Sequence, residues 1–207
     1  DLLVVACNTA SAAALKYLRQ RFPLLPIVGM EPAVKPAAEQ THTKAVGILA
    51  TPTTFQGELY QSLVQRYGDG LNIFPETCPG LVEEIEAGNL HGEKTIVILK
   101  QALYPMLEQN VDTVVLGCTH YPFVLPEIRK IAGKDIQVID PAPAVARRVQ
   151  TLLDQHFEEE LKKNSPPSLL FYTTGEAGIF QKQIKALLGY ESTVKPIFWQ
   201  ADGLRKT

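Results

Sequence analysis

The stretch VVLGCTHYPFVLPE, residues 114–127, places an apolar run typical of a buried strand directly before Cys118 and a group of polar side chains. A second stretch near the start of the chain, LVVACNTASAAAL at residues 3–15, has the same order of residue types around Cys7. In open α/β sheets, ligands bind beyond the carboxyl ends of parallel strands. Both cysteines are therefore predicted to lie at a ligand-binding edge of a sheet.

The rest of the chain alternates in the same way between β-branched apolar runs and apolar residues spaced at a helical period. This alternation is typical of βα units and predicts an α/β fold with mainly parallel sheets. The predicted strands are Leu3–Ala6, Ile27–Gly29, Ala45–Leu49, Leu71–Phe74, Thr113–Leu116, Gln137–Ile139, Leu169–Tyr172 and Val194–Trp199.

Two segments rich in proline and small residues predict crossings between two pseudo-symmetric α/β lobes, with the active site between them. They are EPAVKPAAEQTHTK at 31–44 and DPAPAVARR at 140–148. The predicted division gives residues 32–141 to the second lobe, and residues 1–31 and 142–207 to a first, discontinuous lobe. Because the chain opens at Asp1 and runs at once into a strand, we expect this first lobe to be truncated at its amino terminus.

Composition is that of an ordinary globular protein, with 45% hydrophobic and 20% charged residues and a formal net charge of −2. No basic excess points to nucleic acid or an anionic membrane, and no apolar run approaches the roughly 18 residues of a membrane span. The three cysteines are too scattered for a disulfide framework or a metal finger. We expect a cytoplasmic protein with reduced thiols and no metal.

A cysteine at the start of a helix faces free backbone N–H groups, which favour its thiolate. Each of the two thiols also has polar neighbours, namely Asn8 and Thr9 beside Cys7, and Thr119 and His120 beside Cys118. Taken alone, either cysteine is most simply a packing residue, since cysteine is among the most buried residue types. Together they favour a site in which two thiols act on opposite faces of one ligand, as racemisation at a carbon acid requires.

At these residues the sequence resembles the glutamate racemases, cofactor-independent members of the aspartate/glutamate racemase family. The resemblance rests on ACNTASAAAL and LGCTHYPFVLP, supported by GMEPAVKPA, GILATPTTFQGELYQ, CPGLVEEIEAG and VIDPAPAVARR, and covers about residues 1–155. The family's Asp-Ser-Gly-rich turn and Pro-Tyr-Gly segment do not occur in this sequence. The resemblance implies racemisation of L-glutamate to D-glutamate for peptidoglycan synthesis, with no cofactor, and a possible homodimer.

Carried over position by position, the resemblance assigns the catalytic pair to Cys7 and Cys118 and an assisting role to His120. The implied substrate contacts are Asn8, Thr9, Thr51, Thr54, Glu86 and Thr119. Glu83 is a rival to Glu86, because both belong to the acidic stretch VEEIE.

Residues outside these motifs are interpreted as structural. Cys78 precedes Pro79 with no polar cluster beside it, and Trp199 is predicted to pack inside the molecule. The polar stretch EEELKKNSPPS, residues 158–168, predicts a surface loop or a frayed helix end.

Two alternative functions remain open. One is a related enzyme of the same fold, either a racemase for aspartate or another amino acid or a decarboxylase. The other is a catalytically silent, truncated remnant that acts as a binding protein.

Overall fold

The computed structural model describes residues 1–157, 168–201 and 203–206 as an α/β fold with mainly parallel sheets, so the predicted fold class is confirmed. Most of the predicted loop at 158–168 lies outside the described residues. The strands are β1 (Leu3–Val5), β2 (Ile27–Gly29), β3 (Ala45–Leu49), β4 (Asn72–Glu76), β5 (Thr113–Leu116), β6 (Gln137–Ile139), β7 (Phe171–Thr173), β8 (Val194–Gln200) and β9 (Gly203–Lys206). The helices are α1 (Asn8–Arg21), α2 (Val34–Gln40), α3 (Pro52–Gln56), α4 (Glu58–Tyr67), α5 (Leu81–Glu86), α6 (Glu93–Glu108), α7 (Leu125–Ala132), α8 (Ala142–His156) and α10 (Ala177–Leu188), with a 3₁₀ turn η1 (Tyr121–Val124).

A four-stranded parallel sheet in the order β4-β3-β5-β6 forms the centre of the molecule. Its two middle strands, β3 and β5, are buried along their whole length, which explains why their sequences are continuous apolar runs. Pro75 lies in β4, which is an edge strand. A proline, which has no backbone N–H, is tolerated there because the hydrogen bonds between the inner strands β3 and β5 are not affected.

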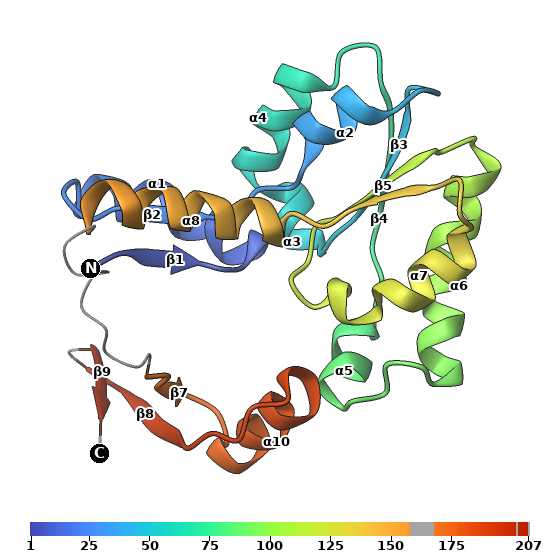
Figure 1. Cartoon of the computed structure of the whole chain (residues 1–207). Coiled ribbons are helices and arrows are strands. Elements are labelled where there is room, and N and C mark those ends of the chain that lie inside the picture. The colour runs from blue at the N-terminus through green and yellow to red at the C-terminus, as the bar shows by residue number, and fades with distance from the viewer. Residues whose placement is uncertain (158–167, 202, 207) are drawn as a thin grey trace.

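Helices cover both faces of this sheet (Figure 1). On one face α5, α6 and α7 pack over a cluster that includes Leu99, Leu103 and Ile128. On the other face α2 and α4 pack over Val46 and Ile48. The carboxyl ends of the parallel strands are thereby held in a rigid frame, on which the candidate site is built.

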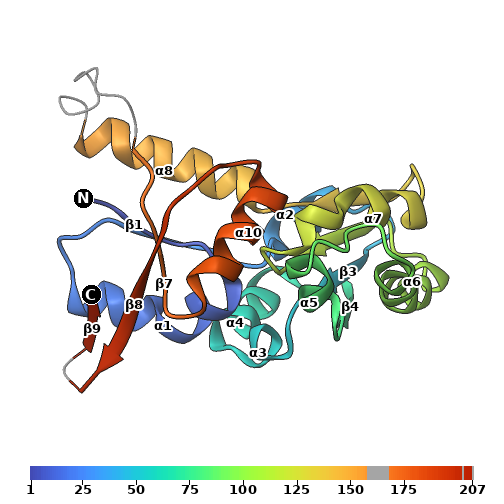
Figure 2. The ribbon, with the colours of Figure 1, turned by 90° about the horizontal axis from the view of Figure 1, so that it is seen from below.

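The remaining strands form two smaller sheets. β1 and β2 are parallel and lie beside α1 and α8, whereas β7, β8 and β9 form a separate sheet with α10 (Figure 2). The antiparallel strand β9 was not predicted. Trp199 is 73% exposed, so the prediction that it packs inside is wrong.

The four-stranded sheet lies wholly within residues 32–141, the range predicted for the second lobe, and the other two sheets lie outside it. The proposed crossings are not plain linkers, because α2 forms within 31–44 and α8 begins within 140–148. The division into two lobes stays a prediction.

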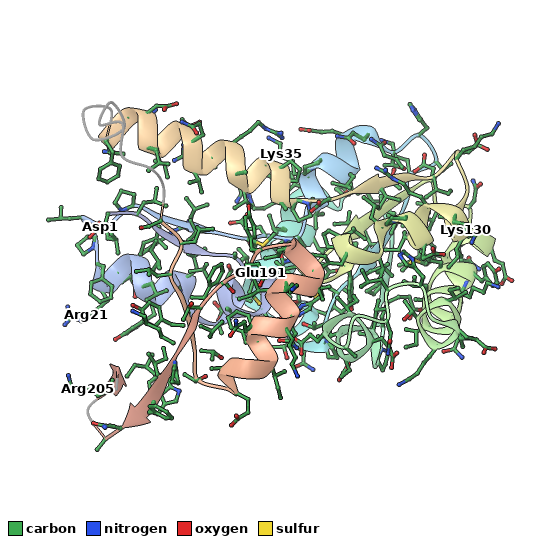
Figure 3. All side chains as sticks on the ribbon, turned by 60° about the horizontal axis from the view of Figure 1, so that its bottom comes forward. Asp1, Arg21, Lys35, Lys130, Glu191 and Arg205 are labelled. Carbon is green, nitrogen blue, oxygen red and sulfur yellow. The ribbon has the colours of Figure 1, made fainter. Side chains whose placement is uncertain are left out.

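Figure 3 shows Asp1, Arg21 and Arg205 toward one end of the molecule and Lys130 at the other. Among the helices of the described residues, none is long and apolar enough to cross a membrane.

Candidate active site

Cys7 lies just beyond the carboxyl end of β1 and forms the N-cap of α1. Its backbone is extended, with φ −154° and ψ 127°, and its Sγ accepts a hydrogen bond from the Ala10 N–H at 3.5 Å. Ser11, one turn into the helix, donates from its hydroxyl to the Val5 carbonyl and accepts from the Met30 N–H. The end of β1, the start of α1 and the end of β2 are therefore fixed to one another around the thiol.

Cys118 takes the corresponding position after β5, one of the two middle strands of the larger sheet. The residue before it, Gly117, allows the backbone to pass close to Ala50. A Cβ at position 117 would lie only 2.8 Å from the Ala50 Cβ. Cys118 is followed by the 3₁₀ turn η1 rather than directly by an α-helix, and its carbonyl accepts from the Tyr121 N–H at 3.1 Å.

The thiolate that was expected at Cys118 is opposed by burial. Only 9% of the residue is exposed, and this burial raises the pKa of the Cys118 thiol above its ordinary value. The backbone N–H groups of His120 and Tyr121 act in the lowering direction without cancelling the effect. The raised pKa favours the neutral form of the Cys118 thiol over its thiolate.

A negative charge on Cys7 also acts to raise the pKa of the Cys118 thiol, so the two side chains lie within electrostatic range. A cavity of about 460 Å³ touches Cys118 and Thr119 and extends between β1 and α8, with Asp140 at its border. The structure thus brings together the two cysteines that the sequence places 111 positions apart, and it leaves space beside one of them.

His120 connects the Cys118 thiol to a carboxylate. One ring nitrogen, Nδ1, lies 3.8 Å from Cys118 Sγ, and the other, Nε2, lies 3.0 Å from Oε1 of Glu86. Because a carboxylate accepts the Nε2 proton, Nδ1 is left as the acceptor that faces the thiol. Glu86 makes this contact, whereas its rival Glu83 is exposed on the same helix and makes no contact with His120.

Three threonine hydroxyls form a closed triangle between α1 and α3. The Oγ1 atoms of Thr9 and Thr51 are 2.8 Å apart, those of Thr51 and Thr54 are 3.0 Å apart, and those of Thr9 and Thr54 are 3.2 Å apart. Thr51 is also the N-cap of α3, and Thr54 is only 1% exposed. All three are residues that the sequence assigned to the site.

Asn8 is 2% exposed, and both polar atoms of its amide lack a hydrogen-bond partner among the described residues. An amide left in this state costs free energy unless a ligand or water completes its bonds. Asn8 follows Cys7 directly, and the sequence assigned it to the same candidate site.

Sequence reasoning missed one pair of residues behind Cys118. Tyr121 is 1% exposed and belongs to the same buried cluster as Cys78 and Cys118. The only signal in the sequence was that both residues follow strand ends. Within the described part of the chain, no group of three or more His, Cys, Asp or Glu side chains is placed to hold a metal ion.

Known proteins share this arrangement of sequence and fold. The sequence profile of the Asp/Glu/Hydantoin racemase family matches residues 1–149. A glutamate racemase from Roseiflexus sp. is 45% identical over 186 residues, which is 90% of this chain and 68% of the relative. One from Pseudomonas paraeruginosa is 51% identical over 151 residues, or 73% of this chain and 57% of the relative.

Among solved structures, Escherichia coli glutamate racemase in complex with L-glutamate and the activator UDP-MurNAc-Ala superposes with a TM-score of 0.77. It is 34% identical, and the match covers 94% of this chain and 73% of that one. The family profile spans the strand ends that carry both cysteine turns, and the chain belongs to the Asp/Glu/Hydantoin racemase family.

Proposed function

We propose that this chain is a glutamate racemase that interconverts L- and D-glutamate by proton transfer at Cα, with Cys7 and Cys118 as the two acid/base groups and no cofactor. The observation that carries the proposal is the pairing of the two thiols, each just beyond the carboxyl end of a parallel strand, with Cys7 near enough for its charge to raise the pKa of Cys118. The curated relatives named glutamate racemase support glutamate as the substrate.

In the proposed reaction, the thiolate of one cysteine takes the Cα proton of glutamate from one face. The thiol of the other cysteine then gives its own proton to the opposite face of the carbanion. One proton leaves and one arrives, so the amino acid is inverted and the two cysteines have exchanged protonation states. Reaction in the reverse direction begins from that exchanged state.

His120 would prepare Cys118 for the proton-accepting role. Because its Nε2 is directed to Glu86, its Nδ1 can receive the thiol proton across the 3.8 Å contact. The thiolate so formed meets the backbone N–H groups of His120 and Tyr121. These fixed dipoles stabilise the charge that burial disfavours.

The substrate's polar groups would be held by residues on both sides of the site. The unsatisfied amide of Asn8 can donate to a carboxylate and accept from an ammonium group. The hydroxyls of Thr9, Thr51 and Thr54 form a second set of donors, and Thr119 lines the cavity beside Cys118. By its family likeness, the proposed product would serve peptidoglycan synthesis.

The test is exchange of the α-proton of L- and D-glutamate in deuterated water, on this chain and on its Cys7→Ser and Cys118→Ser variants. We expect exchange by the parent chain, and loss of racemisation by roughly two orders of magnitude or more in each variant. Circular dichroism of each variant controls for folding.

Aspartate in place of glutamate tests the first alternative, since faster exchange of aspartate would make the chain a racemase of that amino acid. A folded parent chain that exchanges neither substrate would contradict the proposal and favour a binding role.

A further inference from the structure

Ser11 is a buried residue of helix α1 whose side chain forms hydrogen bonds outside its own helix. It is 1% exposed, and its hydroxyl donates to the Val5 carbonyl at 3.1 Å and accepts from the Met30 N–H at 2.9 Å. A serine inside a helix can bond back to the carbonyl four residues earlier, but this hydroxyl instead contacts β1 and the residue that follows β2. It therefore connects three elements at one point.

The two partners of this hydroxyl lie where the pairing of β1 with β2 ends. Val5 is opposite Gly29 in the last register pair of the two strands, and Met30 is the next residue. Gly29 allows α1 to lie close to this point, because a Cβ at position 29 would be 3.2 Å from the Ser11 Oγ. The hydroxyl thus extends the connection between the two strands by one bridge at their carboxyl ends.

Ser11 also holds the Cys7 turn through its backbone. Its N–H donates to the Cys7 carbonyl at 2.8 Å, while its hydroxyl holds the carbonyl of Val5, two residues before Cys7. The Cys7 Sγ in turn accepts a hydrogen bond from the Ala10 N–H at 3.5 Å. The direction of the thiol therefore depends on two carbonyls that are both held by Ser11.

The same hydroxyl reaches the cavity beside Cys118. Met30, whose N–H it accepts, is 3% exposed and lines that cavity, as does Val4 of β1. Ser11 thereby couples the Cys7 turn to one wall of the cavity that Cys118 also lines.

We propose that Ser11 is a positioning residue for Cys7, which holds the carbonyls of Val5 and Cys7 and thereby fixes the direction of the Cys7 thiol toward the substrate. This inference rests on the proposed role of Cys7 as one of the two acid/base groups. Ser11 takes no part in proton transfer itself, since the single proton of its hydroxyl is donated to the Val5 carbonyl.

The experiment compares the rates at which iodoacetamide alkylates Cys7 and Cys118 in one sample at fixed pH, with peptide mass spectrometry to separate the cysteines. Cys7 is partly exposed and Cys118 lines the cavity, so the reagent can reach both. In Ser11→Ala, which removes only the hydroxyl, we expect the Cys7 rate to fall roughly threefold to tenfold, because the released thiolate no longer faces the Ala10 N–H. The Cys118 rate should match that of the parent chain.

Steady-state racemisation of glutamate gives a second readout. Thr9, the nearby substrate contact on α1, is held separately by the hydroxyls of Thr51 and Thr54, so glutamate binding should depend little on Ser11. We expect kcat of Ser11→Ala to fall roughly tenfold or more, because the thiol is misplaced, while KM stays that of the parent chain.

Two further variants make the test specific. Ser11→Thr keeps the hydroxyl and should restore the Cys7 alkylation rate. Thr95→Val is the matched control, since Thr95 is fully buried in α6 and its hydroxyl donates to the Asn89 carbonyl. It should lower the free energy of unfolding, measured by urea denaturation, without changing the ratio of the two alkylation rates.

A purely structural role of Ser11 would lower stability without changing this ratio in the folded chain. A Cys7 rate in Ser11→Ala that is unchanged or faster, an equal fall for both cysteines, or a chain that does not fold would overturn the inference, as would a Ser11→Thr chain that behaves like Ser11→Ala. Alkylation needs no turnover, so these outcomes are distinct from failure of the proposed function, which would show as absence of α-proton exchange in the parent chain.

Discussion

The Nε2 atom of His120 lies 3.0 Å from Oε1 of Glu86, a residue 34 positions earlier in the chain. The contact is half exposed, with 31% of the histidine side chain and 48% of the glutamate side chain open to solvent. An exposed ion pair adds little to stability. Its consequence is chemical, because it determines which ring nitrogen of His120 carries the proton. With the proton on Nε2, the nitrogen that faces Cys118 is free to accept one.

Glu86→Gln is expected to slow racemisation with little change in stability. A glutamine can present its amide N–H to Nε2 and so favour the tautomer whose proton lies on Nδ1, facing the thiol. We expect kcat to fall by roughly tenfold or more, within the range of general acid/base effects. Steady-state kinetics in both directions measure this. Glu83→Gln is the control, because Glu83 lies exposed on the same helix, and equal losses in both variants would contradict the assignment.

Thr54→Val is expected to weaken both folding and glutamate binding. Thr54 is 1% exposed and its hydroxyl contacts the hydroxyls of Thr9 and Thr51, so its removal leaves two partly buried hydroxyls with one partner fewer. We expect a loss of about 1 kcal/mol in the free energy of unfolding, measured by urea denaturation, and a higher KM for glutamate. Thr53→Val, at an exposed position next to it, is the control. A KM in Thr54→Val equal to that of the parent chain would show that these three hydroxyls do not contribute to glutamate binding.

Much of the fold followed from the sequence because burial on both faces leaves a simple pattern. The strands at Ile27–Gly29, Ala45–Leu49 and Thr113–Leu116 were predicted to the residue. The strand expected at Leu71–Phe74 instead runs over Asn72–Glu76, since an edge position tolerates its proline. Strand β9 was missed because a short, polar, antiparallel edge carries no apolar period to detect.

The candidate site was predictable as a set of residues but not as a network. Motifs named His120 and Glu86 separately, and only the packing of α5 against η1 joins them. The choice between Glu83 and Glu86 depends on where α5 ends, which the acidic run does not reveal.

Gly117→Ala is expected to destabilise the sheet directly before Cys118. The added methyl would lie 2.8 Å from the Ala50 Cβ and 2.9 Å from the Leu49 carbonyl oxygen, so β3 and β5 would have to separate. Overpacking of this kind costs about 1–3 kcal/mol, measurable by thermal or urea unfolding, and should also reduce kcat by displacing the thiol. Gly178→Ala in α10 is the matched control, because its Cβ would meet nothing within 4 Å. We expect that variant to be as stable as the parent or slightly more so.

Asp112, at the end of the sheet opposite the cysteines, is expected to make the fold sensitive to acid. Burial acts to raise the pKa of its carboxyl, but hydrogen bonds from the Thr41 hydroxyl, the backbone N–H groups of Thr43 and His42, and the Thr113 hydroxyl outweigh it and lower the pKa to about 2. The unfolded chain has an ordinary value of about 3.9. The stabilisation is therefore complete above about pH 4 and is lost as the pH falls toward 2.

Asp112→Asn should lower the free energy of unfolding by about 1–3 kcal/mol at pH 7, because a neutral amide cannot accept all of these bonds. The difference from the parent chain should shrink as the pH is lowered from 4 to 2, as followed by urea denaturation at each pH. Asp135→Asn, at an exposed position before β6, is the control and should track the parent throughout. A difference between Asp112→Asn and the parent that stays constant over this range would show that the Asp112 carboxylate titrates alike in the folded and unfolded chains.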